Sequence, residues 1–140
     1  MSDCVFCKIC DGQLPSMRIY EDERTLVIMD INPLNPGHCL VLTKAHAPTI
    51  FDSDAEDLGA AIVAGQKVAV AIREALQPDG LNILQANGTA AFQSVPHFHL
   101  HLIPRWVDDE KGFDWDLVPG DRAEITATGE RIRAALGDES

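Results

Sequence analysis

Hydrophobic and polar residues alternate with a period of two from residue 97 to residue 102, where the sequence reads HFHLHL. Successive side chains of a β-strand point to opposite faces of the sheet. We therefore predict a strand whose imidazoles, those of His97, His99 and His101, share one face, while the apolar side chains between them enter a core. Pro96 precedes the first histidine, which suits the start of a strand.

Four further segments have the character of short strands. They are rich in aliphatic and β-branched residues and cover residues 18–20, 25–29, 38–43 and 81–86. Turn residues separate them: Asn35-Pro36-Gly37 precedes the third segment, and Asn87-Gly88 follows the fourth. The chain thus predicts several strands joined by tight turns.

A long helix is predicted over residues 52–76. Ser53 and Glu56 have the spacing of a capping box, and two aspartates add favourable negative charge to the first turn. Apolar or small residues recur at helical spacing at Leu58, Ile62, Gly65, Ala69, Ile72 and Leu76. This helix is expected to be scaffold.

A shorter helix is predicted over residues 121–136, with Ile125 and Ile132 pointing inward. Antiparallel strands combined with one long helix and a C-terminal helix indicate an α+β fold. A chain of 140 residues is the size of one domain, so we expect a single domain over residues 1–140. Its core is predicted over residues 4–105, followed by a variable segment, residues 106–140.

Composition and charge narrow the function classes. The formal net charge of −11 opposes non-specific nucleic-acid binding, which needs a basic surface, so no nucleic-acid partner is expected. No apolar run is long enough to span a membrane, and the N-terminus lacks the layout of a signal peptide, so a cytoplasmic protein is predicted. The acidity fits either a protein adapted to high salt or an ordinary acidic protein.

The histidine row admits three interpretations. It is the solvated face of a strand, a metal site in which imidazoles bind zinc, or a nucleophilic imidazole with neighbours that assist it. Threonine, lysine or glutamate would be more usual on a merely solvated face.

Cysteines near the N-terminus suggest a second site. Cys4 and Cys7 are spaced as a pair of metal ligands or redox thiols, but a thioredoxin-type pair should follow a strand. Zinc would need two further ligands, and two buried thiols without a metal are the simpler alternative. Cys10 extends the spacing without the fourth ligand of an iron–sulfur site and stays unassigned, whereas Cys39 is predicted to be a small core residue.

The sequence QSVPHFHLH, residues 93–101, resembles the motif of the histidine-triad (HIT) family of nucleotide-binding hydrolases and transferases. The resemblance extends over roughly residues 4 to 105. It implies a HIT-like fold and a homodimer. One departure is Phe92, because relatives often carry glycine just before the glutamine; this change is expected to affect what the pocket admits.

The resemblance also implies catalytic roles. His99 would attack the α-phosphorus of a nucleotide derivative, and the resulting nucleotidyl-imidazole would be hydrolysed by water. The other ring nitrogen of His99 would donate to the backbone carbonyl of His97. His101 would bind phosphate oxygens, and Ser94 would contact the phosphate or the leaving group.

Further positions carry over as binding residues. Asp30, which ends a predicted strand, would accept hydrogen bonds from the ribose hydroxyls, although a turn-capping role is the ordinary alternative. Asn87 and Gln93 would lie near the phosphate. Apolar walls for the base are expected from Ile28, Ile31 and Phe6.

Some HIT proteins with an N-terminal Cys-x-x-Cys bind zinc, and the matching ligands here are Cys4, Cys7, His46 and His97. We therefore expect a structural zinc ion. The expected ligand is a purine nucleotide or derivative, and the expected reaction is hydrolysis of a nucleoside 5′-phosphoramidate such as an adenylated amine. The alternatives are dinucleoside polyphosphate hydrolysis, a non-catalytic nucleotide-binding or scaffold protein, and a metallohydrolase that uses all three imidazoles on one metal.

Overall fold

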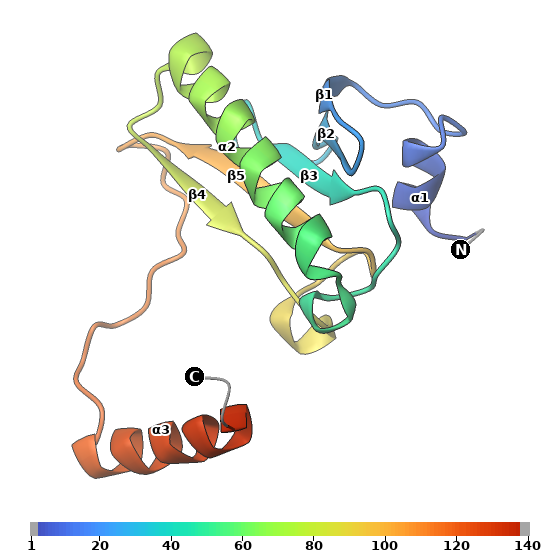
Figure 1. Cartoon of the computed structure of the whole chain (residues 1–140). Coiled ribbons are helices and arrows are strands. Elements are labelled where there is room, and N and C mark those ends of the chain that lie inside the picture. Colours follow the sequence, from blue (N-terminus) through green and yellow to red (C-terminus); the bar gives the residue numbers. More distant parts are fainter. Residues whose placement is uncertain (1–2, 138–140) are drawn as a thin grey trace. The chain divides into compact units, whose positions relative to one another are not determined.

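The computed structural model describes residues 3–137, and the chain divides into two compact units, Met1–Asp109 and Glu110–Ser140 (Figure 1). The first unit contains two α-helices, five strands and two short 3₁₀ turns. In chain order they are α1 (Val5–Cys10), β1 (Arg18–Glu21), β2 (Thr25–Met29), β3 (Cys39–Thr43), η1 (Ile50–Asp52), α2 (Ala55–Leu76), β4 (Gly80–Leu84), η2 (Thr89–Ala91) and β5 (His99–Arg105). The second unit contains α3 (Arg122–Leu136).

The five strands form one sheet in the order β1-β2-β3-β5-β4, and every neighbouring pair is antiparallel. The predicted α+β architecture with an antiparallel sheet is therefore confirmed. β5 pairs with β3 so that His101 lies opposite Leu40 and His99 opposite Leu42. Residues opposite each other in an antiparallel pair share a face, so both imidazoles lie on the face that carries these leucines.

The other face of the sheet packs against α2, which crosses it diagonally (Figure 1). The core on this side contains Val27, Cys39, Val41, Ala61, Ala64, Val68, Ile72, Phe98, Leu100 and Leu102. The predicted inward residues of the histidine strand are all in it. A fully buried aliphatic or aromatic side chain contributes about 1.5–3 kcal/mol, so this layer fixes the register of β5 and hence the direction of its histidines.

A smaller core lies on the histidine side of the sheet and includes α1. Its buried members are Phe6, Ile9, Leu26, Ile28, Leu40 and Leu42. The six-residue α1 was not predicted, because one and a half turns are too short for a helical period to be recognised. The Cys4 sulfur caps it by accepting from the Cys7 N–H at 3.4 Å.

Two predictions for the long helix are wrong in detail. α2 begins at Ala55 with Asp54 as its N-cap, and Ser53 forms no capping box with Glu56. The capping box belongs to η1, where Thr49 and Asp52 exchange hydrogen bonds. Ile62 and Leu76 are exposed, and the buried residues of α2 are Ala61, Ala64, Gly65, Val68 and Ile72.

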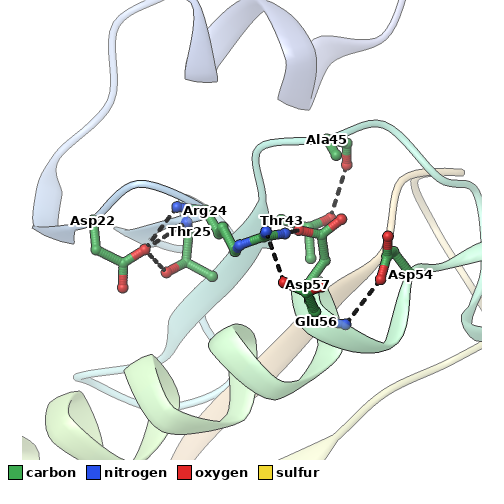
Figure 2. A network of polar contacts seen from close by, with 8 residues as sticks. All are labelled: Asp22, Arg24, Thr25, Thr43, Ala45, Asp54, Glu56 and Asp57. Atoms are coloured by element: carbon green, nitrogen blue, oxygen red, sulfur yellow. Dashed lines mark hydrogen bonds and ion pairs between the residues drawn. The ribbon is translucent and has the colours of Figure 1, made fainter.

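A polar network fastens the N-terminal turn of α2 to the loop between β1 and β2 (Figure 2). Arg24 donates to Asp57 at 2.7 Å and to Glu56 at 3.0 Å. Asp22 accepts from the backbone N–H groups of Arg24 and Thr25 and from the Thr25 hydroxyl. These hydrogen bonds hold the pKa of Asp22 at about 2 despite its desolvation, so the carboxylate stays ionised.

α3 confirms the predicted C-terminal helix, and Asp121 caps it by accepting from the Ala123 N–H at 3.3 Å. Ile125 and Ile132 are about 60% exposed rather than inward as predicted. Among residues 3–137, no helix is both long enough and apolar enough to cross a membrane.

Candidate active site and metal centre

β5 begins at His99, two residues later than predicted, so His99 and His101 lie in the strand and His97 lies two residues before it. The three histidines are desolvated to different degrees. His97 is fully buried and His99 is 4% exposed, whereas His101 is only half-buried. The rings of His99 and His101 contact each other edge to face, with centroids 5.0 Å apart. Burial therefore decreases from His97 to His101, and the rings of His99 and His101 are in contact.

The hydrogen bond that His99 makes to the backbone determines its tautomer. Its Nδ1 lies 2.7 Å from the carbonyl oxygen of His97. A carbonyl can only accept, so Nδ1 carries the proton. Burial lowers the pKa of His99, which favours the neutral ring. The neutral ring with a proton on Nδ1 has a lone pair on Nε2, as a nucleophile requires.

His101 has the opposite arrangement, and His38 is the reason. The Leu34 N–H donates to His38 Nδ1 at 2.9 Å, so His38 carries its proton on Nε2. That nitrogen lies 2.9 Å from His101 Nδ1, which must accept, and His101 therefore carries its proton on Nε2. Burial, and then the neighbouring His99 and His38, lower the pKa of His101 to about 4. At neutral pH, His101 is thus an uncharged hydrogen-bond donor.

Asp30 lies beside this pair. Its Oδ2 is 3.4 Å from His38 Nε2, and its Oδ1 accepts from the Asn32 N–H at 2.8 Å. The carboxylate therefore caps the turn after β2 with one oxygen. The other oxygen faces the histidine row, so a turn-capping role and a binding role are compatible.

The loop before the histidines is held by amide side chains. Gln93 accepts from the Gly88 N–H at 2.7 Å and donates to the Pro48 carbonyl at 2.6 Å. Asn87 accepts from the Ile50 N–H at 2.7 Å and exchanges hydrogen bonds with Gln85. In this state both residues shape the loop. Ser94 is exposed beside it.

Phe92 lies in the same loop and has a left-handed backbone, with φ of 66° and a side chain that is 91% exposed. Glycine adopts this conformation without strain, whereas a bulky side chain makes it unfavourable. The backbone conformation at residue 92 would thus suit glycine better than phenylalanine.

The residues predicted to wall the base differ in exposure. Phe6 is 7% exposed, and its ring contacts the His99 ring edge to face with centroids 5.0 Å apart. Ile28 is 3% exposed and belongs to the core beside Phe6. Ile31 is 89% exposed. Of the three, Ile31 offers the most surface to a ligand.

The predicted metal ligands converge. The ligand atoms of Cys4, Cys7, His46 and His97 all lie within 4.8 Å of one another. The Cys4 sulfur is 3.2 Å from His97 Nδ1, the Cys7 sulfur is 3.3 Å from His46 Nδ1, and the two Nδ1 atoms are 3.2 Å apart. Tetrahedral zinc with ordinary bond lengths places its ligands roughly 3.3–3.8 Å apart. Two thiols and two imidazoles at this spacing fit zinc.

Hydrogen bonds around the cluster complete the fit. His97 Nε2 donates to the Thr43 carbonyl at 2.6 Å, which leaves Nδ1 free of a proton and able to bind a cation. The Thr43 hydroxyl donates to the Ala45 carbonyl and shapes the turn before His46 (Figure 2). Burial, and then the neighbouring Cys4, raise the pKa of the Cys7 thiol to about 11, so a thiolate there needs a compensating cation.

The remaining cysteines lie outside this cluster. Cys39 is 2% exposed, belongs to the core under α2 as predicted, and burial raises its pKa to about 11. Cys10 is the last residue of α1 and packs at the edge of the smaller core. All four cysteines are free thiols.

His38 is the functional candidate that the sequence pattern alone did not single out. It stands just before an apolar run, where the pattern predicts only the start of a strand. A histidine between a Pro-Gly turn and a strand is the only signal in the sequence, whereas its contact with His101 arises because β3 and β5 are neighbours.

Comparison with known proteins agrees with this geometry. The family model for the HIT domain matches residues 11–107. The protein named hit of Bacillus subtilis is 43% identical over 132 residues, covering 90% of this chain and 91% of its own length. The adenosine 5′-monophosphoramidase hnt1 of Schizosaccharomyces pombe is 34% identical, covering 95% and 98%. The adenylylsulfatase HINT3 of Arabidopsis thaliana is 41% identical, covering 74% and 53%.

Solved structures give the same result. A HIT family member from Bacillus subtilis superposes with a TM-score of 0.91 at 35% identity, covering 98% of this chain and 99% of that one. A zinc-bound histidine triad protein from Mycobacterium smegmatis has a TM-score of 0.76 at 41% identity, covering 96% and 98%. Fold and relatives together define the class of HIT nucleotide hydrolases and transferases. The chain belongs to the HIT family.

Proposed function

We propose that this protein hydrolyses nucleoside 5′-phosphoramidates, with adenosine as the preferred nucleoside, through a nucleotidyl-His99 intermediate. The observation that carries the proposal is the pair of opposite tautomers: His99 has its Nε2 lone pair free, and His101 has a proton on Nε2. One ring is therefore prepared to attack phosphorus and the next to donate to a phosphate oxygen. The relatives named as a monophosphoramidase and an adenylylsulfatase support adenylyl compounds as substrates.

The chemistry proceeds in two displacements. His99 Nε2 attacks the α-phosphorus, the P–Nε2 bond forms, and the P–N bond to the leaving amine breaks as the amine takes up a proton from solvent. Water then attacks the same phosphorus and returns one proton to solvent, which breaks the P–Nε2 bond and releases the nucleoside monophosphate with a neutral ring. The hydrogen bond from His99 Nδ1 to the His97 carbonyl persists throughout and disperses the positive charge of the substituted ring.

The remaining residues bind and orient the substrate in this proposal. His101 and Ser94 donate to phosphate oxygens, where charge develops in the transition state. Asp30 accepts from the ribose hydroxyls with the oxygen that its turn leaves available. Asn87 and Gln93 hold the loop before the histidines, which lies near the phosphate. The base contacts Phe6, Ile28 and Ile31 in this proposal.

Zinc at Cys4, Cys7, His46 and His97 would have a structural role. The cluster connects the start of α1 to the turn after β3 and to the segment that leads into β5, three segments far apart in the sequence. A cation there would neutralise two thiolates and fix these segments together. Free thiols that ligate a metal suit a reducing compartment such as the cytoplasm.

A two-fold homodimer through α2 and β4 is part of the proposal. β4 is an edge strand with Ile83 50% exposed, and α2 exposes Ile62, Val63 and Val70 at 49–52%. An edge strand beside an apolar helix face is a surface that natural proteins usually cover. Light scattering should give a dimer mass, and Ile83→Lys should reduce it towards the monomer; a monomeric wild type would refute this assembly.

The activity is tested with an adenosine 5′-phosphoramidate beside diadenosine tri- and tetraphosphate, using the wild type and His99→Asn. Asparagine keeps a donor for the His97 carbonyl but has no nucleophilic ring nitrogen. We expect phosphoramidate turnover to fall by about 10³-fold or more in the variant, with AMP binding retained. Rapid quenching and mass spectrometry should detect the nucleotidyl adduct only in the wild type. Wild-type turnover by His99→Asn would reject the covalent mechanism, and faster cleavage of the dinucleotides would select the alternative substrate class.

A further inference from the structure

A second polar network lies at the far end of β5, around the carboxylate of Asp109. Its Oδ2 accepts from Arg105 Nε at 2.8 Å, from the Trp106 N–H at 3.0 Å and from Asn35 Nδ2 at 2.9 Å. Its Oδ1 accepts from Arg105 Nη2 at 3.0 Å. The side chain of Asp109 is only 9% exposed. A buried carboxylate with this many partners holds those partners in one geometry.

Asn35 connects this network to the β2–β3 loop. It is 7% exposed, and its Nδ2 donates both to Asp109 and to the Pro104 carbonyl, at 2.9 Å each. Its own carbonyl accepts from the His38 N–H at 3.2 Å. The Asn35 side chain therefore ties this loop to β5, and its backbone is bonded directly to His38.

The neighbour of Asn35 determines the proton position on the histidine pair. The Leu34 N–H donates to His38 Nδ1 at 2.9 Å, and His38 Nε2 lies 2.9 Å from His101 Nδ1. The two neutral tautomers of an imidazole differ little in intrinsic free energy, so the hydrogen bonds decide between them. Asp30 Oδ2, at 3.4 Å from His38 Nε2, favours the same tautomer through a longer contact. If residue 34 moves, His38 loses the shorter of these two hydrogen bonds, so its proton is held on Nε2 less strongly and the tautomers of His101 begin to mix.

We propose that Asn35 and Asp109 are positioning residues, termed here the Asn35–Asp109 clamp, that fix the Leu34 N–H and thereby keep the proton of His101 on Nε2. The clamp contacts neither substrate nor reacting atoms and acts only through His38. Its catalytic consequence rests on the proposed function, because a donor at His101 Nε2 matters only if that nitrogen faces a phosphate. Its effect on the tautomer does not depend on any substrate.

The alternative is that the network merely holds the turn after β5. Asn35→Ala distinguishes the two, because it breaks the link to the loop while Asp109 keeps its bonds to Arg105 and Trp106. Asp109→Asn weakens both functions by removing the charge from those bonds. Asp108→Asn is the matched control: it makes the same charge change one residue away, at an exposed side chain.

The test combines ¹⁵N NMR of the histidine rings with steady-state kinetics and thermal melts of the zinc-loaded protein. In the wild type and in Asp108→Asn, we expect His101 to show a protonated Nε2 and an unprotonated Nδ1. In Asn35→Ala and Asp109→Asn, the two nitrogen shifts should move towards each other as the tautomers mix. We expect kcat for the phosphoramidate to fall by about tenfold, with KM changed by less than about threefold.

A wild-type tautomer signal in Asn35→Ala, with or without a lower melting temperature, would overturn the clamp. If the proposed function is wrong, the result differs: the wild type would not cleave the phosphoramidate, but the His101 tautomers would still mix in Asn35→Ala and Asp109→Asn.

Discussion

Phe6 connects the helix that carries Cys7 to the histidine proposed as nucleophile, so its removal tests how the smaller core supports the site. The side chain is 7% exposed, and its ring contacts those of His97 and His99 with centroid distances of 5.8 and 5.0 Å. Truncation of a buried phenylalanine to alanine costs about 3–5 kcal/mol. Because the smaller core has few other members, we expect Phe6→Ala to cost about 3 kcal/mol.

Phe6→Leu separates the ring contacts from the volume. It keeps most of the apolar volume but loses two edge-to-face contacts, so a cost of about 1–1.5 kcal/mol is expected. For a unit of this size, about 4 °C of melting temperature corresponds to each kcal/mol, which gives a decrease of about 12 °C for Phe6→Ala. kcat should fall in both variants, because the His99 ring loses a neighbour that restricts it.

Urea unfolding and calorimetry in excess zinc measure these effects, with Phe51→Ala as the control. Phe51 is 86% exposed, so its truncation should change stability by less than about 0.5 kcal/mol. The reasoning is refuted if Phe6→Ala is no more destabilising than Phe51→Ala. A large loss of stability with unchanged kcat would refute only the proposed link between Phe6 and the orientation of His99.

Three further predictions follow from the structure. The free energy of unfolding should decrease as pH falls from about 6.5 towards 4, because burial lowers the pKa values of His38, His99 and His101 and the unfolded chain therefore binds more protons in this range. In His101→Gln, the urea midpoint should depend less steeply on pH over this interval. An unchanged pH dependence would contradict a lowered pKa of His101. Chelation of zinc should lower the melting temperature of the wild type. Cys4→Ser should melt at this lowered temperature both with and without chelator. If all samples melt at the same temperature, a stabilising metal is excluded. Gly65→Ala should stabilise the protein by about 0.5–1 kcal/mol, because alanine favours the helix and the added Cβ would meet Leu102 and Val41 at an ordinary distance of 3.8 Å. Destabilisation in urea unfolding would show that this contact does not tolerate a methyl group.

The sequence by itself determined the features that depend on local pattern. Alternation in HFHLHL predicted a strand and its buried face, since the side-chain period of a strand is two; the buried side chains are confirmed, and the strand itself begins at His99. Helical periodicity located α2 and α3, and the cysteine spacing together with family resemblance identified four ligands whose atoms do converge.

Only the tertiary structure decided which distant groups meet. Antiparallel pairing of β3 with β5 brings His38 within hydrogen-bonding distance of His101, and the buried Asn35 joins the β2–β3 loop to Asp109. It also decided the N-terminus of α2, where Asp54 rather than Ser53 caps the helix because Thr49 and Asp52 form their own turn first. Side-chain tautomers are set by such contacts, and contacts between residues more than sixty positions apart leave no periodic trace in the sequence.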